Sequence, residues 1–132
     1  MTRILLVEDD LTLLQRTKAT LQTDYFPDYT FYTAGSLREA IDKIKDVQAV
    51  SLIVADYELT DGNAYDLLKY CQENLSDVPV IIITAFGHDA SKEVRAALSF
   101  QKGAFDFIDK SSDIEELVER IKRALEIVKA LA

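Results

Sequence analysis

Five short β-branched runs alternate with stretches of helical periodicity along this chain of 132 residues, and that alternation restricts the fold more than any other feature. The runs are RILLV (3–7), YTFYT (29–33), SLIVA (51–55), VIIIT (80–84) and FDFID (105–109). In the last helical stretch the apolar residues are Ile114, Leu117, Val118, Ile121, Leu125 and Val128. A strand-then-helix order repeated five times predicts a three-layer α/β domain, with a parallel sheet between two helical layers.

Two of these runs also predict which strands are buried at the centre of the sheet. LIVA and VIII are apolar at every position, as expected for central strands that are buried on both faces. The longest apolar run, VPVIII, is much too short to cross a membrane. The single cysteine, Cys71, excludes an internal disulfide and fits a cytoplasmic location. We therefore expect one domain over residues 1–132, without a membrane span.

Charge and chain length restrict the partners. Lysine and arginine number 15 against 23 acidic residues, a net charge of −8, which repels phosphate backbones and argues against direct binding of nucleic acid. The chain stops in EIVKALA, a helical pattern without a glycine, asparagine or proline stop signal. We expect the domain to be the N-terminal part of a longer protein.

Local signals place several helix ends. Ser36 followed by Glu39 predicts a capping box for the second helix. The Asp61-Gly62-Asn63 triplet predicts a loop before the third helix, and Gly103 is expected to close the fourth.

Polar side chains follow four of the five predicted strands, at the edge of the sheet where sites form in open α/β folds. Glu8 and Asp9 follow the first strand, and Asp56 follows the third. Thr84 ends the fourth strand, and Lys110 follows the fifth. The sequence therefore predicts a polar crevice built from these strand ends.

Three carboxylates in one crevice favour a hard divalent cation, because they cannot all stay ionised without compensation. Mg²⁺ is the expected ion, and one cysteine and one histidine cannot build a soft-metal site. With a cation bound, Asp56 could attack phosphorus, while Lys110 and Thr84 contact the oxygens of the transferring group. Taken singly, each residue also has a structural explanation: a helix start, a turn cap, a strand end or a surface lysine.

Four motifs resemble those of response-regulator receiver domains, the phosphoacceptor half of two-component signalling. They are ILLVEDD, LIVADYELTDGNAYDLL, VPVIIITAFG and KGAFDFIDK, in the family's order over the whole chain. The resemblance implies a flavodoxin-like (βα)5 fold with strand order 2-1-3-4-5. It also implies a signalling switch rather than an enzyme, with Asp56 accepting a phosphoryl group from a sensor histidine kinase or a phosphotransfer protein.

The resemblance assigns further roles at the cation site. Asp9 would bind Mg²⁺, or Mn²⁺ in its place, directly and Glu8 through water, and the backbone carbonyl of Glu58 would complete the site with Asp56. Asp10 lies one place beyond the family's acidic pair, so we expect it to cap the first helix.

The resemblance also names the parts of the switch. Thr84 would be the switch hydroxyl, Phe107 the switch aromatic and Lys110 the phosphate-contacting lysine. Thr84 would move toward the phosphoryl oxygens and Phe107 would turn into the vacated space, which changes the distal face for an output domain or partner. The family's usual dimer face, the fourth helix, fifth strand and fifth helix, predicts a homodimer, and the TAFG and GAFDFIDK motifs hint at transcriptional regulation.

Four departures from the family pattern stand out. Ser111 follows Lys110 where proline is usual, and Thr60 and Ala64 replace a proline and a glycine in the loop after Asp56. The segment 87–103 is about four residues longer than expected, which corresponds to roughly one helical turn. The region 24–36, with Pro27 in it, is also a few residues long.

Two alternative functions remain open from the sequence. The first is a receiver-like protein interaction module that never carries phosphate. The second is a small hydrolase or flavin carrier on the same fold, although VEDDLTL lacks the hydroxyl- and glycine-rich character that a flavin phosphate requires.

Overall fold

The computed structural model describes residues 1–75, 77–85 and 102–131. Five parallel strands form the central sheet in the order β2-β1-β3-β6-β7, which confirms the expected order 2-1-3-4-5. The strands are β1 (Arg3–Val7), β2 (Thr30–Ala34), β3 (Leu52–Asp56), β6 (Val80–Thr84) and β7 (Asp106–Asp109). Each of the five expected runs forms a strand, and the ends differ from the expected ones by at most one residue.

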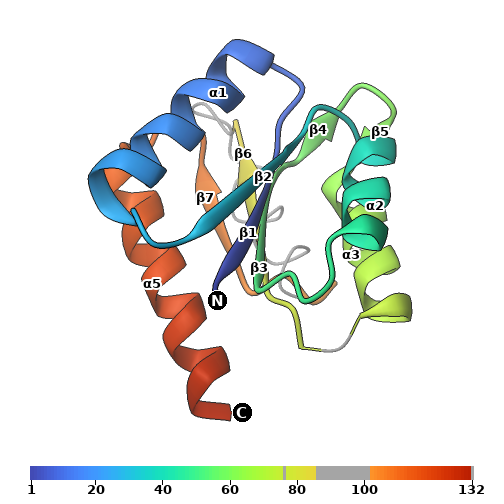
Figure 1. Cartoon of the computed structure of the whole chain (residues 1–132). Helices are drawn as coiled ribbons and strands as arrows, with labels where there is room; N and C mark the ends of the chain where they lie inside the picture. The colour runs from blue at the N-terminus through green and yellow to red at the C-terminus, as the bar shows by residue number, and fades with distance from the viewer. Residues whose placement is uncertain (76, 86–101, 132) are drawn as a thin grey trace.

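Helices cover both faces of the sheet (Figure 1). On one face lie α1 (Leu11–Thr20) and α5 (Ile114–Leu131), and on the other lie α2 (Leu37–Asp46) and α3 (Ala64–Asn74). The three-layer arrangement expected from the alternating sequence pattern is therefore confirmed. The carboxyl ends of β1, β3, β6 and β7 meet at one edge of the sheet, as parallel strands require.

Two apolar cores lie on the two sides of the sheet. One packs the sheet against α2 and α3, and the other packs it against α1 and α5. Strand β3 is buried at every position, as its continuous apolar sequence predicts. In α5 the buried residues repeat at helical spacing, and they are Leu117, Val118, Ile121 and Ala124.

The first backbone N–H groups of α2 donate hydrogen bonds to side chains from two segments of the chain. The Ser36 hydroxyl accepts from the Glu39 N–H at 3.0 Å, as predicted, but the Glu39 carboxylate accepts from Gly35 rather than from Ser36. The expected capping box is therefore only half formed. Asp61, 24 residues away, accepts from the Leu37 N–H at 2.7 Å and from the next N–H at 2.9 Å. These backbone bonds lower the pKa of Asp61.

The loop after β3 is a short antiparallel hairpin of β4 (Glu58–Leu59) and β5 (Gly62–Asn63). Asn63, predicted to lie in a loop, is the N-cap of α3, and together with Asp66 it forms a full capping box. A Cβ atom on Gly62 would approach a Leu37 methyl carbon to 2.7 Å and the Asp66 Oδ2 atom to 2.9 Å, so a larger residue would require both side chains to shift. The hairpin thus holds this loop without the family's proline and second glycine.

A π-helix, η1 (Leu21–Tyr25), continues α1. It extends into the region 24–36, which is a few residues longer than expected for the family. Its ring is closed by the Phe26 N–H, which donates to the Leu21 carbonyl at 2.7 Å. Leu21, the first residue of η1, and Phe26, which follows the helix, are both buried in the core between the sheet and α1. The Phe26 ring also stacks on Tyr29, with centroids 4.9 Å apart.

Two expectations fall largely outside the described residues. The fourth helix and the extra length of the 87–103 segment lie mostly in residues 86–101, which the structure does not describe. Gly103, expected to close that helix, has a positive φ of 98°. Within the described part of the chain, no helix combines the length and apolar character needed to cross a membrane.

Candidate metal and phosphoacceptor site

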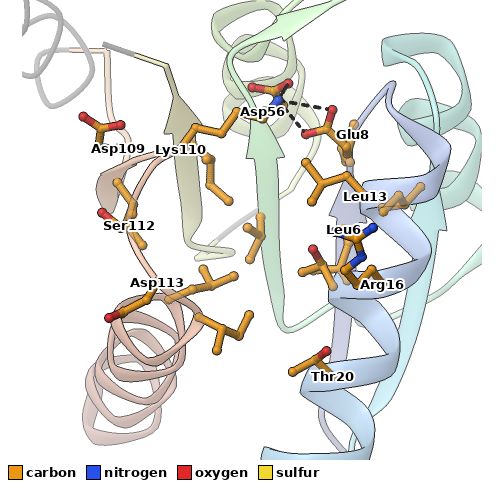
Figure 2. A pocket seen from close by; sticks show the side chains of 18 residues that line it. Leu6, Glu8, Leu13, Arg16, Thr20, Asp56, Asp109, Lys110, Ser112 and Asp113 are labelled. Atoms are coloured by element: carbon orange, nitrogen blue, oxygen red, sulfur yellow. Dashed lines mark hydrogen bonds and ion pairs between the residues drawn. The ribbon is translucent and has the colours of Figure 1, made fainter. Parts of the chain in front are cut away.

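The carboxylates of Glu8 and Asp56 meet the ammonium group of Lys110 at the carboxyl edge of the sheet (Figure 2). The Lys110 Nζ atom lies 3.1 Å from Asp56 Oδ2 and 3.3 Å from Glu8 Oε2. The side chains of Asp56 and Glu8 are 8% and 12% exposed, whereas that of Lys110 is 33% exposed. The crevice predicted from the strand ends therefore contains a lysine that bridges two nearly buried acids.

Asp9 completes a cluster of three carboxylates with Glu8 and Asp56. One oxygen from each residue lies within 4.8 Å of the other two. All the donors are carboxylate oxygens, the type that Mg²⁺ and Mn²⁺ prefer. The charge balance fits too, because a single lysine offsets only one of the three negative charges. These residues could therefore hold a hard divalent cation.

Glu8 shows the electrostatic cost of this cluster most clearly. Burial, the nearby negative charge of Asp56 and a hydrogen bond to that carboxyl raise the pKa of Glu8 to about 7. Two contacts oppose the rise: the Asp10 N–H donates to Glu8 Oε1 at 3.0 Å, and Lys110 supplies a positive charge. Without a cation, Glu8 is thus poised to take up a proton near neutral pH.

Lys110 stays positively charged in this setting. Partial burial lowers the pKa of Lys110, but its hydrogen bond to Asp56 and the charges of Asp56 and Glu8 outweigh that effect and raise the value above its usual range. Its backbone N–H donates to the Thr84 carbonyl at 2.8 Å, which extends the β6–β7 ladder by one residue beyond the strand.

Thr84 and Phe107 face the same side of the sheet. Ile82 pairs with Phe107 in the β6–β7 register, and Thr84 lies two residues after Ile82, so the alternation of side chains places them together. Thr84 is 4% exposed, and Phe107 packs against the core on the α2 and α3 side. Thr84 thus lies between the carboxyl edge of the sheet and the residue pair Ile82–Phe107, and it is joined to Lys110 through the backbone.

Glu58, whose carbonyl was expected to bind the cation, sits in β4 directly after the Asp56-Tyr57 pair. The Ala64 N–H donates to the Tyr57 carbonyl at 2.9 Å, which makes Glu58 and Asn63 a non-hydrogen-bonded pair of the hairpin. The Glu58 carbonyl is therefore turned away from its partner strand. This orientation leaves the carbonyl oxygen able to act as a ligand.

Asp10 has the helix-capping role expected for it. It is the N-cap of α1, and its Oδ1 atom accepts from the Leu13 N–H at 3.1 Å. It thus stands apart from the three clustered acids, as expected.

A cavity of about 310 Å³ extends from this site between α1 and α5 (Figure 2). Its apolar floor comes mainly from the core side chains Leu6, Leu14, Val54, Ile108 and Leu117. The lysine and both nearly buried acids line one end, so the site is open to an approaching molecule from this side.

Two contacts near the site go beyond the residues assigned from the sequence. The strand ends predict that Lys110 and Glu8 share one crevice, but not that the lysine pairs directly with Glu8, 102 positions away. The second is the turn after Lys110, in which Asp109 accepts from Ser111. The signal for that turn was present, since Asp-x-Ser is a common turn sequence.

The fold and the oxygen-only cluster at its strand ends define a flavodoxin-like domain that could bind a hard cation at the carboxyl edge of its sheet. The family model for the response regulator receiver domain matches residues 4–122. The chain therefore belongs to the response regulator receiver domain family of two-component systems.

Curated relatives include transcriptional regulators. The chain is 32% identical over 126 residues to the C4-dicarboxylate transport transcriptional regulatory protein DctD of Pseudomonas aeruginosa, covering 96% of this chain and 26% of that protein. It is 31% identical over 125 residues to the transcriptional regulatory protein CpxR of Escherichia coli, covering 95% of this chain and 50% of that protein. The chain thus spans between a quarter and a half of the length of these relatives.

A solved structure extends the likeness to three dimensions. The beryllofluoride-activated NtrC4 receiver domain dimer superposes with a TM-score of 0.83 at 32% identity, covering 97% of this chain and 99% of that one. The relative is thus a receiver domain that takes the same fold over its full length.

Proposed function

We propose that the domain accepts a phosphoryl group on Asp56 from a sensor histidine kinase or a phosphotransfer protein. The observation that carries this proposal is the position of the Asp56 carboxylate, 3.1 Å from the Lys110 ammonium and within the three-acid cluster. A nearly buried carboxylate that is accessible from one cavity, next to a fixed positive charge, suits attack on phosphorus.

In the transfer, an Asp56 oxygen forms a bond to phosphorus while the phosphorus–nitrogen bond of the donor phosphohistidine breaks. The electron pair of that bond returns to the imidazole nitrogen, which leaves as a neutral base after taking a proton. Lys110 lies close enough to neutralise charge on the phosphoryl oxygens. Asp9, Asp56 and the Glu58 carbonyl would hold Mg²⁺ directly, with Glu8 acting through water. When bound, the cation supplies positive charge to the transferring group.

The switch follows from the arrangement on β6 and β7. Thr84 moves its hydroxyl toward the phosphoryl oxygens, and Phe107, on the same face, turns into the space it leaves. The contact of Lys110 with Glu8 and Asp56 rearranges at the same time, because the phosphoryl group adds about two negative charges. The surface near Phe107 then controls an output partner or domain in the cytoplasm, with phosphorylation setting its affinity.

Regulation of transcription is the proposed output, in line with the names of the relatives. The chain covers only part of each relative, so a DNA-binding or other output segment would lie outside residues 1–132. Homodimerisation is proposed because the matched NtrC4 receiver domain is a dimer. The family resemblance suggests the face of the fourth helix, β7 and α5, of which the fourth helix lies outside the described residues.

The test is phosphorylation of the domain by acetyl phosphate with Mg²⁺, followed by intact mass. The parent should gain one phosphoryl group, Asp56→Asn should gain none, and Asp28→Asn, which alters an exposed loop acid, should match the parent. Equal gain by Asp56→Asn would refute the assignment. Absence of Mg²⁺ binding at millimolar concentration would favour an interaction module that is never phosphorylated.

A further inference from the structure

The turn that follows β7 fixes the backbone of Lys110 from both sides. Before the lysine, its own N–H is bonded to the Thr84 carbonyl at 2.8 Å. After it, the Ser112 N–H donates to the Asp109 carbonyl at 2.9 Å, which closes a four-residue turn with Lys110 as its second residue.

The Asp109 side chain reinforces that turn. Its Oδ1 atom accepts from the Ser111 N–H at 2.9 Å and from the Ser111 hydroxyl at 3.0 Å. A proline at position 111 would have no N–H to donate, so the backbone bond requires a residue other than proline, and the second bond requires a hydroxyl such as that of Ser111. The hydrogen bonds of Ser111 thus hold the turn at the position where proline is usual in the family.

The placement of this turn matters because a lysine side chain is a flexible four-carbon stem. Its ammonium group must reach Asp56 at 3.1 Å and Glu8 at 3.3 Å, on the opposite side of Lys110 from Asp109 (Figure 2). An error of about 1 Å in the position of a charged group can cost roughly a hundredfold in rate.

We infer that Asp109, through its hydrogen-bonded turn with Ser111, is a positioning residue for Lys110 in the phosphoryl transfer. This inference rests on the proposed function for its rate effect. Its structural part, the ordering of the Lys110 side chain, stands by itself. Asp109 acts through the turn and makes no bond to the phosphoryl group.

The first experiment measures the order of the Lys110 side chain by NMR relaxation in the unphosphorylated domain. Asp109→Ala should make the Lys110 terminal carbon mobile, whereas Asp109→Asn, which keeps an oxygen acceptor, should leave it as ordered as in the parent. Asp109→Val, which also removes the acceptor, should repeat the effect of Asp109→Ala and serves if that variant does not fold. An equally ordered Lys110 in Asp109→Ala, or in Asp109→Val where Asp109→Ala does not fold, would overturn the inference.

The second experiment measures phosphorylation by acetyl phosphate. Asp109→Ala should react about five- to tenfold more slowly, from the loss of one or two hydrogen bonds, and Asp109→Asn should restore the parent rate. Ser36→Ala is the matched control, because Ser36 accepts the Glu39 N–H at 3.0 Å at the start of α2 and does not line the cavity beside Lys110. It should lower thermal stability and leave the rate unchanged.

The two experiments separate the inference from the proposed function. A parent domain that gains no phosphoryl group from any donor refutes the proposed function, and the NMR result then decides the role of Asp109. If Asp109→Asn is as slow and as mobile as Asp109→Ala, charge rather than the turn is responsible, and the inference fails. An equal slowing by Ser36→Ala would also overturn it, since general loss of stability would then explain the rate.

Discussion

Replacing Glu8 by glutamine should make the metal-free domain more stable at alkaline pH. Glu8 is held near Asp56 with only partial compensation from Lys110, and its pKa is raised from the ordinary 4.5 to about 7. The folded domain therefore binds this proton more tightly than the unfolded chain does. Between those two values unfolding releases a proton, so the free energy of unfolding falls as pH rises.

The size of the effect follows from that shift. One pKa unit corresponds to about 1.4 kcal/mol, so the raised pKa of Glu8 costs the folded state about 3 kcal/mol once the group is ionised. The stability that the bound proton on Glu8 gives the folded state is fully present below pH 4.5 and is lost by about pH 8. Glutamine does not ionise, so the stability difference between Glu8→Gln and the parent should grow by about 3 kcal/mol from pH 4.5 to pH 8.

The assay is urea unfolding in EDTA at both pH values. Comparing the two proteins removes the other titrating groups, which they share. Glu73→Gln, an exposed change of the same chemistry on α3, should track the parent at both pH values. Saturating Mg²⁺ at pH 8 should reduce the advantage of Glu8→Gln, because a cation relieves the repulsion in the parent. Parallel pH curves for the parent and Glu8→Gln in EDTA would refute the reasoning.

Two further changes test the contacts that hold the domain together. Asp61→Ala should cost about 1 kcal/mol in urea unfolding, because two N–H groups at the start of α2 lose their acceptor, and an unchanged midpoint would contradict that role. Arg120→Met should cost about 2 kcal/mol, since Asp106 is 6% exposed and loses its 2.6 Å partner. The double variant with Asp106→Asn should recover part of that loss, and no recovery would show that the ion pair is not the cause.

The sequence predicted the strands and the site because both depend on local patterns. Continuous apolar runs such as LIVA identify strands that are buried on both faces, and parallel strands must end at one edge. The sequence therefore predicts that Glu8, Asp56 and Lys110 share one crevice, and the structure places the lysine in contact with both acids.

The contacts that were not predicted involve partners far apart in the chain or a change of helix type. Asp61 accepts hydrogen bonds from the start of α2 from 24 residues away, and it satisfies an N–H group that the local capping pattern leaves without an assigned partner. The π-helix from Leu21 to Tyr25 has no propensity signal, since it reflects the need to bury Leu21 and Phe26 together. Local sequence rules describe neither kind of contact.

The π turn after α1 also bears on how the domain tolerates changes in length. A π turn contains one more residue than the α turn it interrupts, which is how a single-residue insertion can be absorbed inside a helix. Deleting one residue there would restore an ordinary α turn. Leu14, which lies earlier in α1, would keep its buried position. Alignment gaps among homologues are therefore expected between positions 21 and 26, and such indels should leave the three-acid cluster and Lys110 in place.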